Sequence, residues 1–508
     1  MGLVGPTGLV DPVVVLVGGV RPRGVYERHA PPSPGRRLPA GTSARHPRGM
    51  AIDAASGRDG SDLGAGGGLG RVAAAAFVGT AIEFYDFFLY GMAAALVFGH
   101  VYFPALGTAG ALLAALSVYA VAFVARPVGA VVFGHFGDRV GRKAVLVASL
   151  LLMGLCTAAV GMLPGYAQWG IWSPIALVLL RFGQGLGLGG EWGGAALLLA
   201  EYAPPGRRGR YAGYLQLGPA AGSVLATTVF LALSAGLTGA DFTGWGWRVP
   251  FLGSLILVGV GLFVRLRIAE TPVFAAAESA PRGGAPVLEV LRGHWRTVLL
   301  GGGMLSFGYA LFYLTNTYAL AYATTDLGVD RTRMLTLQLL AVPLGALAVW
   351  CSAGGSDRWG RRRTVLVAGA LAAGWSLLVF PLLETLRSGL MLLGLAGASL
   401  LLGVILGPVG AYLPELFPTR VRYTGAALTY NLGGVVGGAT APLLATRLTA
   451  EYGTATPVGW YLAGLGVVSL LCLRALPETG GCDLTRGQAG LPAAAGRRAA
   501  AVSGGPAV

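Results

Sequence analysis

The sequence predicts an all-helical, polytopic membrane protein made of two similar six-helix halves, and three observations predict it. Only 12% of the residues are charged and 54% are hydrophobic, with a mean hydropathy of +0.67, and so few charges cannot cover a surface that faces water. From Arg71 onward, apolar runs long enough to cross a bilayer alternate with short loops. One loop motif recurs in both halves of the chain, which indicates an internal duplication.

The apolar runs predict twelve membrane-spanning helices, because a span needs about 20 apolar residues. They form an N-terminal half over residues 71–267 and a C-terminal half over residues 297–476, joined by a proline-containing linker over residues 268–296. Halves related in this way are expected to rock about a central site. The runs lie near residues 72–98, 110–133, 144–164, 173–200, 209–235, 249–267, 297–322, 334–354, 364–384, 389–413, 421–446 and 458–476.

Both ends of the chain are expected to be disordered tails. Residues 1–70 are rich in Gly, Pro, Ala and Arg and have no helical period. Met50 is an alternative start, and we expect that residues 1–49 reflect a start codon assigned too far upstream. Residues 477–508 have a similar composition without heptads, so no C-terminal coiled coil is expected.

Basic residues gather in the loops on one side of the predicted bundle. Arg207 and Arg208 follow the fourth run and Arg361 to Arg363 follow the eighth, whereas the loops on the other side hold few, such as Arg387. Loops rich in basic residues stay in the cytoplasm. We therefore expect a multi-pass protein of the cell (plasma) membrane with both termini cytoplasmic. The net charge of +15 then reflects topology and not nucleic-acid binding.

The duplicated motif is a short loop between two helix ends. Its glycines allow backbone conformations that other residues resist, and its aspartates can accept from free N–H groups at a helix start or pair with Arg. The first copy is Gly134-His-Phe-Gly-Asp138-Arg139-Val-Gly141-Arg142-Lys143, and the second is Ala353-Gly-Gly-Ser-Asp357-Arg358-Trp-Gly360-Arg361-Arg362-Arg363.

A second repeated element places an acid at the end of the fourth and tenth runs, with basic residues close behind. We interpret both elements as a set of cytoplasmic salt bridges that holds the protein open to the outside. Topogenic charge combined with helix capping is the alternative. The predicted gate residues are Asp138, Arg139, Arg142, Glu201, Arg207, Asp357, Arg358, Arg361, Glu415 and Arg420.

These loops resemble the signature of the major facilitator superfamily. Three further segments, Gly79 to Gly91, Arg181 to Gly194 and Trp245 to Phe251, resemble the metabolite:proton symporter family, and within it the shikimate-transporter-like group. The resemblance covers about residues 71–480. It implies the major facilitator fold and proton-coupled transport of a small metabolite by alternating access, and it is specific to the family but not to a substrate.

Ionisable residues inside a span are costly, so each one is a functional candidate. Glu83 and Asp86 share a face of the first run, and Arg126 and Glu191 lie at a similar depth on the second and fourth. We expect Glu83, Asp86 and Glu191 to include the proton carrier, with Arg126 or Arg181 as partner. Burial raises the proton affinity of an acid and a formed ion pair lowers it, so the acid can bind and release a proton as the pair opens and closes. A static buried ion pair is the alternative.

The substrate site is expected to combine Arg181, whose guanidinium suits a carboxylate, with uncharged polar residues that can hydrogen-bond a small solute. The latter could equally be helix-packing residues. The predicted substrate-binding residues are Arg181, Gln184, Tyr313, Asn316, Tyr430 and Asn431.

Together with the resemblance, these patterns predict a proton-coupled importer of a small organic metabolite that works as a monomer with the substrate, protons and the bilayer as its partners. The resemblance implies that the metabolite is a carboxylate. The alternatives are uptake of a zwitterion such as betaine or proline and proton-driven efflux, which a partial antiporter pattern at Gly218 to Gly222 suggests. We expect no enzyme activity, cofactor, metal or nucleic-acid partner, because no nucleophile–base or metal-ligand pattern is present.

Overall fold

The computed structural model describes residues 62–140, 142–204, 206–267 and 286–482. These residues belong to one compact unit, residues 59–508. Met50, residues 268–285 of the expected linker and residues 483–508 of the expected C-terminal tail lie outside the described residues. So do the side chains of residues 62–69, 71, 72, 109, 134–144, 198, 201, 202, 267 and 286.

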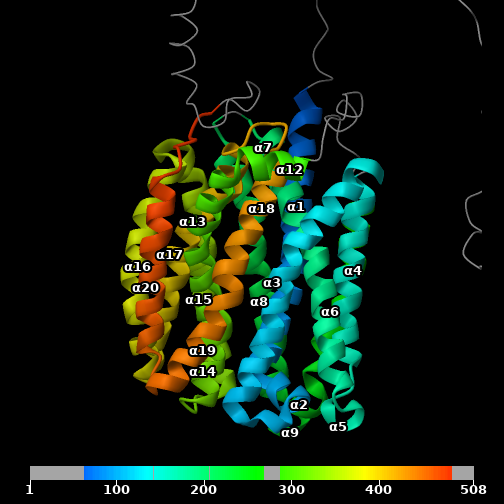
Figure 1. Cartoon of the computed structure of the whole chain (residues 1–508), viewed down its shortest axis with the longest axis vertical. Coiled ribbons are helices and arrows are strands. Elements are labelled where there is room, and N and C mark those ends of the chain that lie inside the picture. The colour runs from blue at the N-terminus through cyan, green and yellow to red at the C-terminus, as the bar shows by residue number, and fades with distance from the viewer. Residues whose placement is uncertain (1–61, 141, 205, 268–285, 483–508) are drawn as a thin grey trace, which may run out of the picture. The chain divides into compact units, whose positions relative to one another are not determined.

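The N-terminal half consists of long apolar helices joined by short connections (Figure 1). Its helices are α1 (Asp62–Ala93), α2 (Gly99–Tyr102), α3 (Gly107–Val140), α4 (Arg142–Met162), α5 (Tyr166–Trp169), α6 (Trp172–Gly189), α7 (Glu191–Tyr202), α8 (Arg208–Gly236), α9 (Gly239–Asp241) and α10 (Arg248–Arg267). The short helix α12 (Pro286–Gly293) occupies the described end of the linker.

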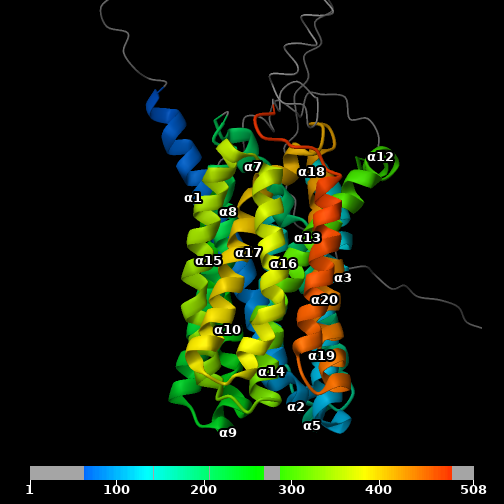
Figure 2. The ribbon, with the colours of Figure 1, turned by 90° about the vertical axis from the view of Figure 1, so that its left-hand side faces the viewer.

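The C-terminal half repeats this order, and Figure 2 shows its helices α15, α16 and α20 running along one side of the unit. Its helices are α13 (Trp295–Tyr313), α14 (Ala319–Thr325), α15 (Arg331–Trp359), α16 (Arg361–Glu384), α17 (Ser388–Glu415), α18 (Arg422–Gly433), α19 (Thr440–Tyr452) and α20 (Thr456–Arg474).

Ten helices in the described residues are long and apolar enough to cross a membrane, with α1 and α13 counted together with the segments that continue them. The runs over 172–202 and 422–452 complete the expected twelve. The first is divided at Gly190 into α6 and α7. The second contains Arg422 and Asn431 within α18. The predicted all-helical, twelve-helix fold is confirmed.

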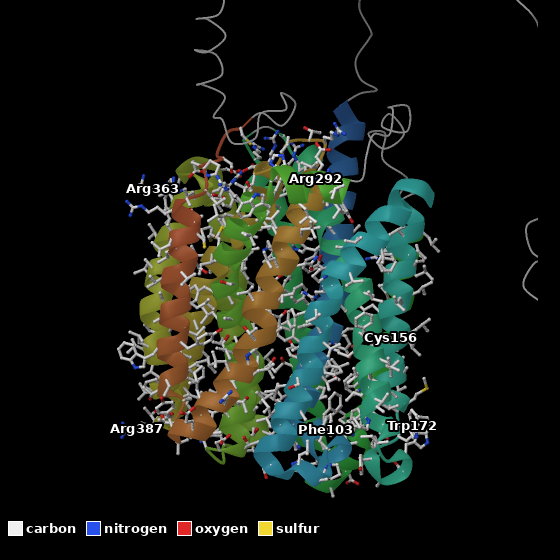
Figure 3. All side chains as sticks on the ribbon, in the orientation of Figure 1. Phe103, Cys156, Trp172, Arg292, Arg363 and Arg387 are labelled. Carbon is white, nitrogen blue, oxygen red and sulfur yellow. The ribbon has the colours of Figure 1, made fainter. Side chains whose placement is uncertain are left out.

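The outward surface of the bundle is apolar. Ile256, Leu179 and Leu471 are 73%, 66% and 63% exposed, which in water would be unfavourable for large aliphatic side chains. Trp172 and Phe103 lie at the same end of the bundle as Arg387, opposite the end that carries Arg292 and Arg363 (Figure 3). We call the end with Arg292 and Arg363 the motif end, because the second copy of the duplicated loop lies there.

Four π-helical turns widen helices in the described part of the chain. Ala94–Phe98 joins α1 to α2 and Leu314–Tyr318 joins α13 to α14, so the first helix of each half is widened at the corresponding place. The other two are Phe242–Gly246 and Gly434–Ala439. Such turns are rare and concentrate at functional places. The recurrence supports the internal duplication independently of the loop motif.

Small residues bring α3 and α6 into backbone contact. A Cβ atom added at Gly189 would lie 2.0 Å from the carbonyl oxygen of Arg126, which is far inside van der Waals contact. The Gly185 to Gly190 run therefore serves helix packing, as expected for small residues in membrane helices. The contact also fixes the position of Arg126 beside α6.

The structure corrects the two expected tail boundaries. Helix α1 begins at Asp62, inside the segment expected to be disordered to residue 70. Residues 477–482, which we call the C-terminal strap, are also ordered rather than part of a disordered tail. The Glu478 carboxylate accepts from the backbone N–H groups of Arg361, Arg362 and Arg363 at 2.8, 3.1 and 3.4 Å and so caps the start of α16. A cap of this kind depends on tertiary contact and leaves no local pattern.

Candidate functional site

One face of α1 carries four side chains toward the centre of the unit. Glu83, Asp86, Phe87 and Tyr90 follow the i, i+3, i+4, i+7 spacing of a helix face, and all four are buried. Glu83 Oε2 and Asp86 Oδ1 have no hydrogen-bond partner among the described residues. Buried carboxylates that lack partners are costly, which makes this face a site that a ligand or a proton can stabilise.

Two buried arginines face this surface from α3 and α6. The Arg126 guanidinium lies 4.6 Å from the centre of the Phe87 ring, and the Arg181 guanidinium lies 4.5 Å from the same centre. Arg181 is also 4.0 Å from the Tyr90 ring and 4.8 Å from the Tyr119 ring. Two like charges beside one ring repel each other in a poorly polarisable interior.

Neither arginine has a carboxylate within 4.0 Å among the described residues. Their Nε and Nη2 atoms have no hydrogen-bond partner there either. The direct pairing expected between Arg126 or Arg181 and the acids of α1 is therefore wrong for this conformation. The guanidinium groups are stabilised by aromatic faces instead and retain donors for an anion.

Arg181 and Asp86 are connected indirectly, through Gln184 and Thr157 of α4. Arg181 Nη1 donates to Gln184 Oε1 at 3.1 Å, and Gln184 Nε2 donates to Thr157 Oγ1 at 2.7 Å. Thr157 Oγ1 lies 2.9 Å from Asp86 Oδ2, to which it donates. Three helices thus contribute to one buried hydrogen-bonded chain.

Glu191 of α7 pairs with an arginine near the end of another helix. Its Oε1 atom forms an ion pair with Arg265 of α10, and both side chains are nearly buried. Gly79 on α1 makes room for the pair, because a Cβ there would lie 3.1 Å from Glu191 Oε1. Glu191 therefore has an ion-pair partner in this conformation, whereas Glu83 has none among the described residues.

The predicted substrate residues of the C-terminal half fall in different places. Tyr313 packs on the rings of Phe87 and Phe123, with centroid distances of 5.3 and 5.1 Å, beside the two arginines. Tyr430 stacks on Trp192 at 3.7 Å. Asn431 Nδ2 donates to the carbonyl of Gly189 at 3.5 Å. These contacts join the two halves around the centre.

Asn316 lies apart from the arginines, on a mostly apolar cavity of about 70 Å³ between α8 and the C-terminal half. Gln216, Ser223 and Gln338 also line this cavity. Pockets that hold organic ligands usually measure about 300–1,000 Å³, so the cavity as it stands is too small for a metabolite. The conformation described is closed around its centre.

At the motif end, Asp357 joins the halves. Its carboxylate accepts from the backbone N–H groups of Gly209 and Arg210 at 2.8 and 3.0 Å, at the start of α8. Arg361 forms ion pairs with Asp357 at 2.7 Å and with Glu415 at 3.4 Å. Gly360 takes a φ of +92°, the conformation that favours glycine.

The other predicted gate residues contribute less or cannot be placed. Arg207 and Arg358 are exposed. Arg420 pairs with Glu289 of α12 at 3.1 Å, but both side chains are substantially exposed, so the pair contributes little. The side chains of Asp138, Arg139, Arg142 and Glu201 lie outside the described part of the chain.

The halves also meet at the centre and at the opposite end. At the centre, Phe312 packs edge-on against Phe84 at 6.1 Å and tilted against Phe88 at 5.1 Å. At the opposite end, the Arg331 guanidinium lies 3.8 Å from the Phe242 ring. Contacts between the halves therefore exist on both sides of the central arginines.

Sequence reasoning missed several residues of this site. Thr157 places a hydroxyl group inside an apolar run. Such a polar residue indicates either helix packing or a functional role. Tyr90 could have been found from its spacing, because it lies on the same helical face as Asp86 and Phe87. Arg265 could not be paired with Glu191 without coordinates. In the described residues, no group of three or more His, Cys, Asp or Glu is placed to hold a metal ion.

The profile of the Major Facilitator Superfamily matches residues 76–442, most of the chain. The chain belongs to the major facilitator superfamily. Its relatives include the inner membrane metabolite transport protein YhjE of Escherichia coli, which is 45% identical over 80% of this chain and 94% of that protein. The shikimate transporter of Escherichia coli is 36% identical over 75% of this chain and 88% of that protein.

Solved structures of the superfamily share the fold. The proton:xylose symporter XylE matches with a TM-score of 0.67 at 17% identity, over 82% of this chain and 98% of that one. As a member of the major facilitator superfamily with relatives named as metabolite transporters, the protein is a membrane-spanning metabolite transporter and not an enzyme.

Proposed function

We propose that this protein imports a small organic anion together with protons. The observation that carries the proposal is the pair of buried guanidiniums beside Phe87, whose Nε and Nη2 atoms have no partner among the described residues. An organic carboxylate accepts from such donors in a bidentate manner. It would also remove the repulsion between the two charges.

The proposal assigns proton coupling to the acids of α1. Glu83 and Asp86 are buried near the arginines and keep one oxygen each without a partner in the described structure. If both carboxylates and both arginines are charged, the cluster is neutral and attracts no anion. Protonation of an acid leaves a net positive charge, so anion binding and proton binding favour each other.

A zwitterion is the second candidate substrate. Relatives include the proline/betaine transporter of Salmonella typhimurium, 32% identical over 81% of this chain. Aromatic rings such as those of Tyr309 and Tyr430, whose centroids are 5.3 Å apart, suit a quaternary ammonium group. The excess of arginine at the centre favours an anion over this alternative.

Efflux has weaker support. Gly218 and Gly222, which carry the partial antiporter pattern, pack against α1: a Cβ at Gly222 would lie 2.6 Å from the carbonyl oxygen of Ala81. Close packing thus accounts for both glycines without a role in the direction of transport.

The test is uptake into proteoliposomes under an imposed pH gradient. Radiolabelled shikimate, succinate, proline and glycine betaine would be compared, each with and without a protonophore. Accumulation of shikimate or succinate that the protonophore abolishes supports the proposal. Accumulation of only proline or betaine supports the zwitterion, extrusion supports efflux, and uptake insensitive to the protonophore contradicts proton coupling.

We also propose that the motif end faces the cytoplasm, with both termini on that side of the cell membrane. Basic side chains of the motif end, such as Arg292 and Arg363, support this, and Arg387 marks the other end (Figure 3). In a variant without native cysteines, a membrane-impermeant maleimide added to intact cells should label Arg387→Cys but not Arg363→Cys. The reverse pattern would invert the orientation.

A further inference from the structure

We propose that Thr157 and Gln184 form a relay that transmits the charge state of Asp86 to Arg181. This proposal rests on the proton-coupled transport proposed above and names the residues that couple its two parts. Neither Thr157 nor Gln184 is ionisable, so in this relay they position hydrogen bonds between the acid and the arginine.

The relay has one defined direction. Arg181 can only donate, so Gln184 must accept through Oε1 and donate through Nε2 to Thr157. The Thr157 hydroxyl therefore receives a hydrogen bond from Gln184 at 2.7 Å and directs its own proton elsewhere. All four members are at least 98% buried, so water does not compete for these bonds.

The hydroxyl of Thr157 has two acceptors within reach. Asp86 Oδ2 lies at 2.9 Å and the carbonyl oxygen of Met153 at 3.0 Å. A single proton serves one of them at a time. An ionised Asp86 holds the hydroxyl proton, because hydrogen bonds to charged groups are the stronger ones. When Asp86 takes up a proton, it can donate to Thr157 Oγ1, and the hydroxyl proton turns to Met153.

Arg181 is the group affected by the protonation of Asp86. In the described structure, Gln184 is its hydrogen-bond partner, while its Nε and Nη2 atoms have none. With Asp86 ionised, the relay links the guanidinium to a negative charge. With Asp86 protonated, that negative charge is gone and Arg181 becomes a better partner for an incoming anion. The relay thereby links the two binding events without a direct ion pair.

Other charged or titratable groups lie on the helices packed on and near α1. Tyr85 and Arg181 interact electrostatically with Asp86. The others are Glu83 and Tyr90 on α1 itself, Tyr119 and Arg126 on α3, Glu191 on α7, Arg265 on α10 and Tyr313 on α13. Among these, Arg181 is the one that the hydrogen-bonded chain reaches.

The test compares variants that keep or remove single relay atoms. Thr157→Val is isosteric and removes the hydroxyl, Thr157→Ser keeps it, and Gln184→Met removes the amide at similar length. Thr429→Val is the matched control, because the buried Thr429 hydroxyl donates at 2.7 Å to the Gly425 carbonyl of its own helix. Two rates are measured in proteoliposomes: accumulation driven by a pH gradient, and exchange without a gradient. The probes are radiolabelled shikimate, succinate, proline and glycine betaine.

We expect Thr157→Val and Gln184→Met to lower driven accumulation by at least about fivefold, the low end of coupling between two sites, and Thr157→Val to keep exchange within about twofold. Thr157→Ser and Thr429→Val should behave as wild type. Unchanged accumulation in Thr157→Val, or a parallel loss of exchange, overturns the relay while leaving proton-coupled transport intact. Failure of the wild type to accumulate any probe overturns the proposed function and the relay together.

Discussion

At the scale of single residues, the molecule separates charges that the membrane would normally force together. Arg126 and Arg181 lie beside one phenylalanine ring rather than beside a carboxylate. Asp86 reaches Arg181 only through neutral side chains. A buried charge without a counter-ion is costly. Such a charge is retained at a site where a bound ligand can neutralise it.

Asp86 gives the first prediction. Asp86→Asn keeps the shape of the side chain but cannot take up a proton at neutral pH. We expect pH-gradient-driven accumulation to fall at least about tenfold while gradient-free exchange survives. The substitution removes the proton binding that is coupled to substrate binding, and leaves substrate binding itself in place. The measurement is radiolabel uptake in proteoliposomes.

The matched control is Asp241→Asn, since Asp241 is exposed at the opposite end of the bundle. It should accumulate substrate as wild type does. If Asp86→Asn accumulates as well as the control, Asp86 is not the proton carrier, and Glu83 becomes the acid to substitute next.

Glu191 gives the second prediction. Glu191→Gln leaves Arg265 charged and nearly buried without its partner, and breaking a buried pair costs about 3–5 kcal/mol. We expect a clear loss of unfolding free energy in detergent. Intrinsic tryptophan fluorescence during denaturation measures it. Adding Arg265→Gln should restore part of it.

The exposed pair Arg420–Glu289 supplies the comparison. Glu289→Gln should change the unfolding free energy by less than about 1 kcal/mol, as surface pairs do. A Glu191→Gln variant as stable as Glu289→Gln would show that the Glu191–Arg265 pair contributes nothing to the fold.

At the scale of elements, the period and length of the apolar runs were sufficient to predict the spans. Depth along each run also placed Glu83, Asp86, Arg126 and Glu191 in the buried interior. Their partners could not be predicted, because Arg265 and Thr157 meet them from other helices. The π-helical turns and the C-terminal strap also depend on tertiary contacts, and neither has a recognisable local pattern.

The C-terminal strap gives the third prediction. Thr479 Oγ1 donates to Glu415 at 2.6 Å, and Arg208 of the N-terminal half donates to the Cys482 carbonyl at 2.7 Å. Cys482 is buried, and burial, followed by the Glu415 carboxylate, raises the pKa of its thiol to about 11. Because the thiolate is the reactive form and populates only as pH rises toward that pKa, alkylation at pH 7–8 should be slow.

Removing the strap contact should expose this thiol. In a variant that keeps Cys482 as its one cysteine, Arg208→Ala should speed maleimide labelling several-fold, as measured by mass spectrometry over time. Arg210→Ala, an exposed arginine on the same helix, is the control. Equal labelling rates in the two variants would mean that the strap does not depend on Arg208.

At the scale of the whole molecule, contacts between the halves lie on both sides of the centre, and the ones at the motif end are mostly polar. Alternating access requires that such contacts break on one side at a time. Their individual energies are small, but a difference of a few kcal/mol decides which state is populated.

Asp357 gives the fourth prediction. Asp357→Asn removes the charge that caps the start of α8 and pairs with Arg361. We expect the motif end to open more often, seen by electron–electron resonance as a longer-distance population between spin labels on Arg207→Cys and Arg358→Cys in a background without native cysteines.

Asp330→Asn is the control at the opposite end, because Asp330 caps α15 within its own half by accepting from Arg333 N–H at 3.0 Å. It should leave the label distances unchanged. Identical distance distributions in both variants would assign Asp357 to local capping alone.

The widened turns of the first helix in each half have a consequence for how the chain tolerates changes in length. In a regular α-helix, removing one residue rotates everything beyond it by about 100°, which would turn buried faces toward lipid. A π-helical turn holds one residue more than an α-turn. Loss of one residue within Ala94–Phe98 or Leu314–Tyr318 can therefore be absorbed by return to α-helical winding, so these two short segments can shorten without disturbing what lies on either side.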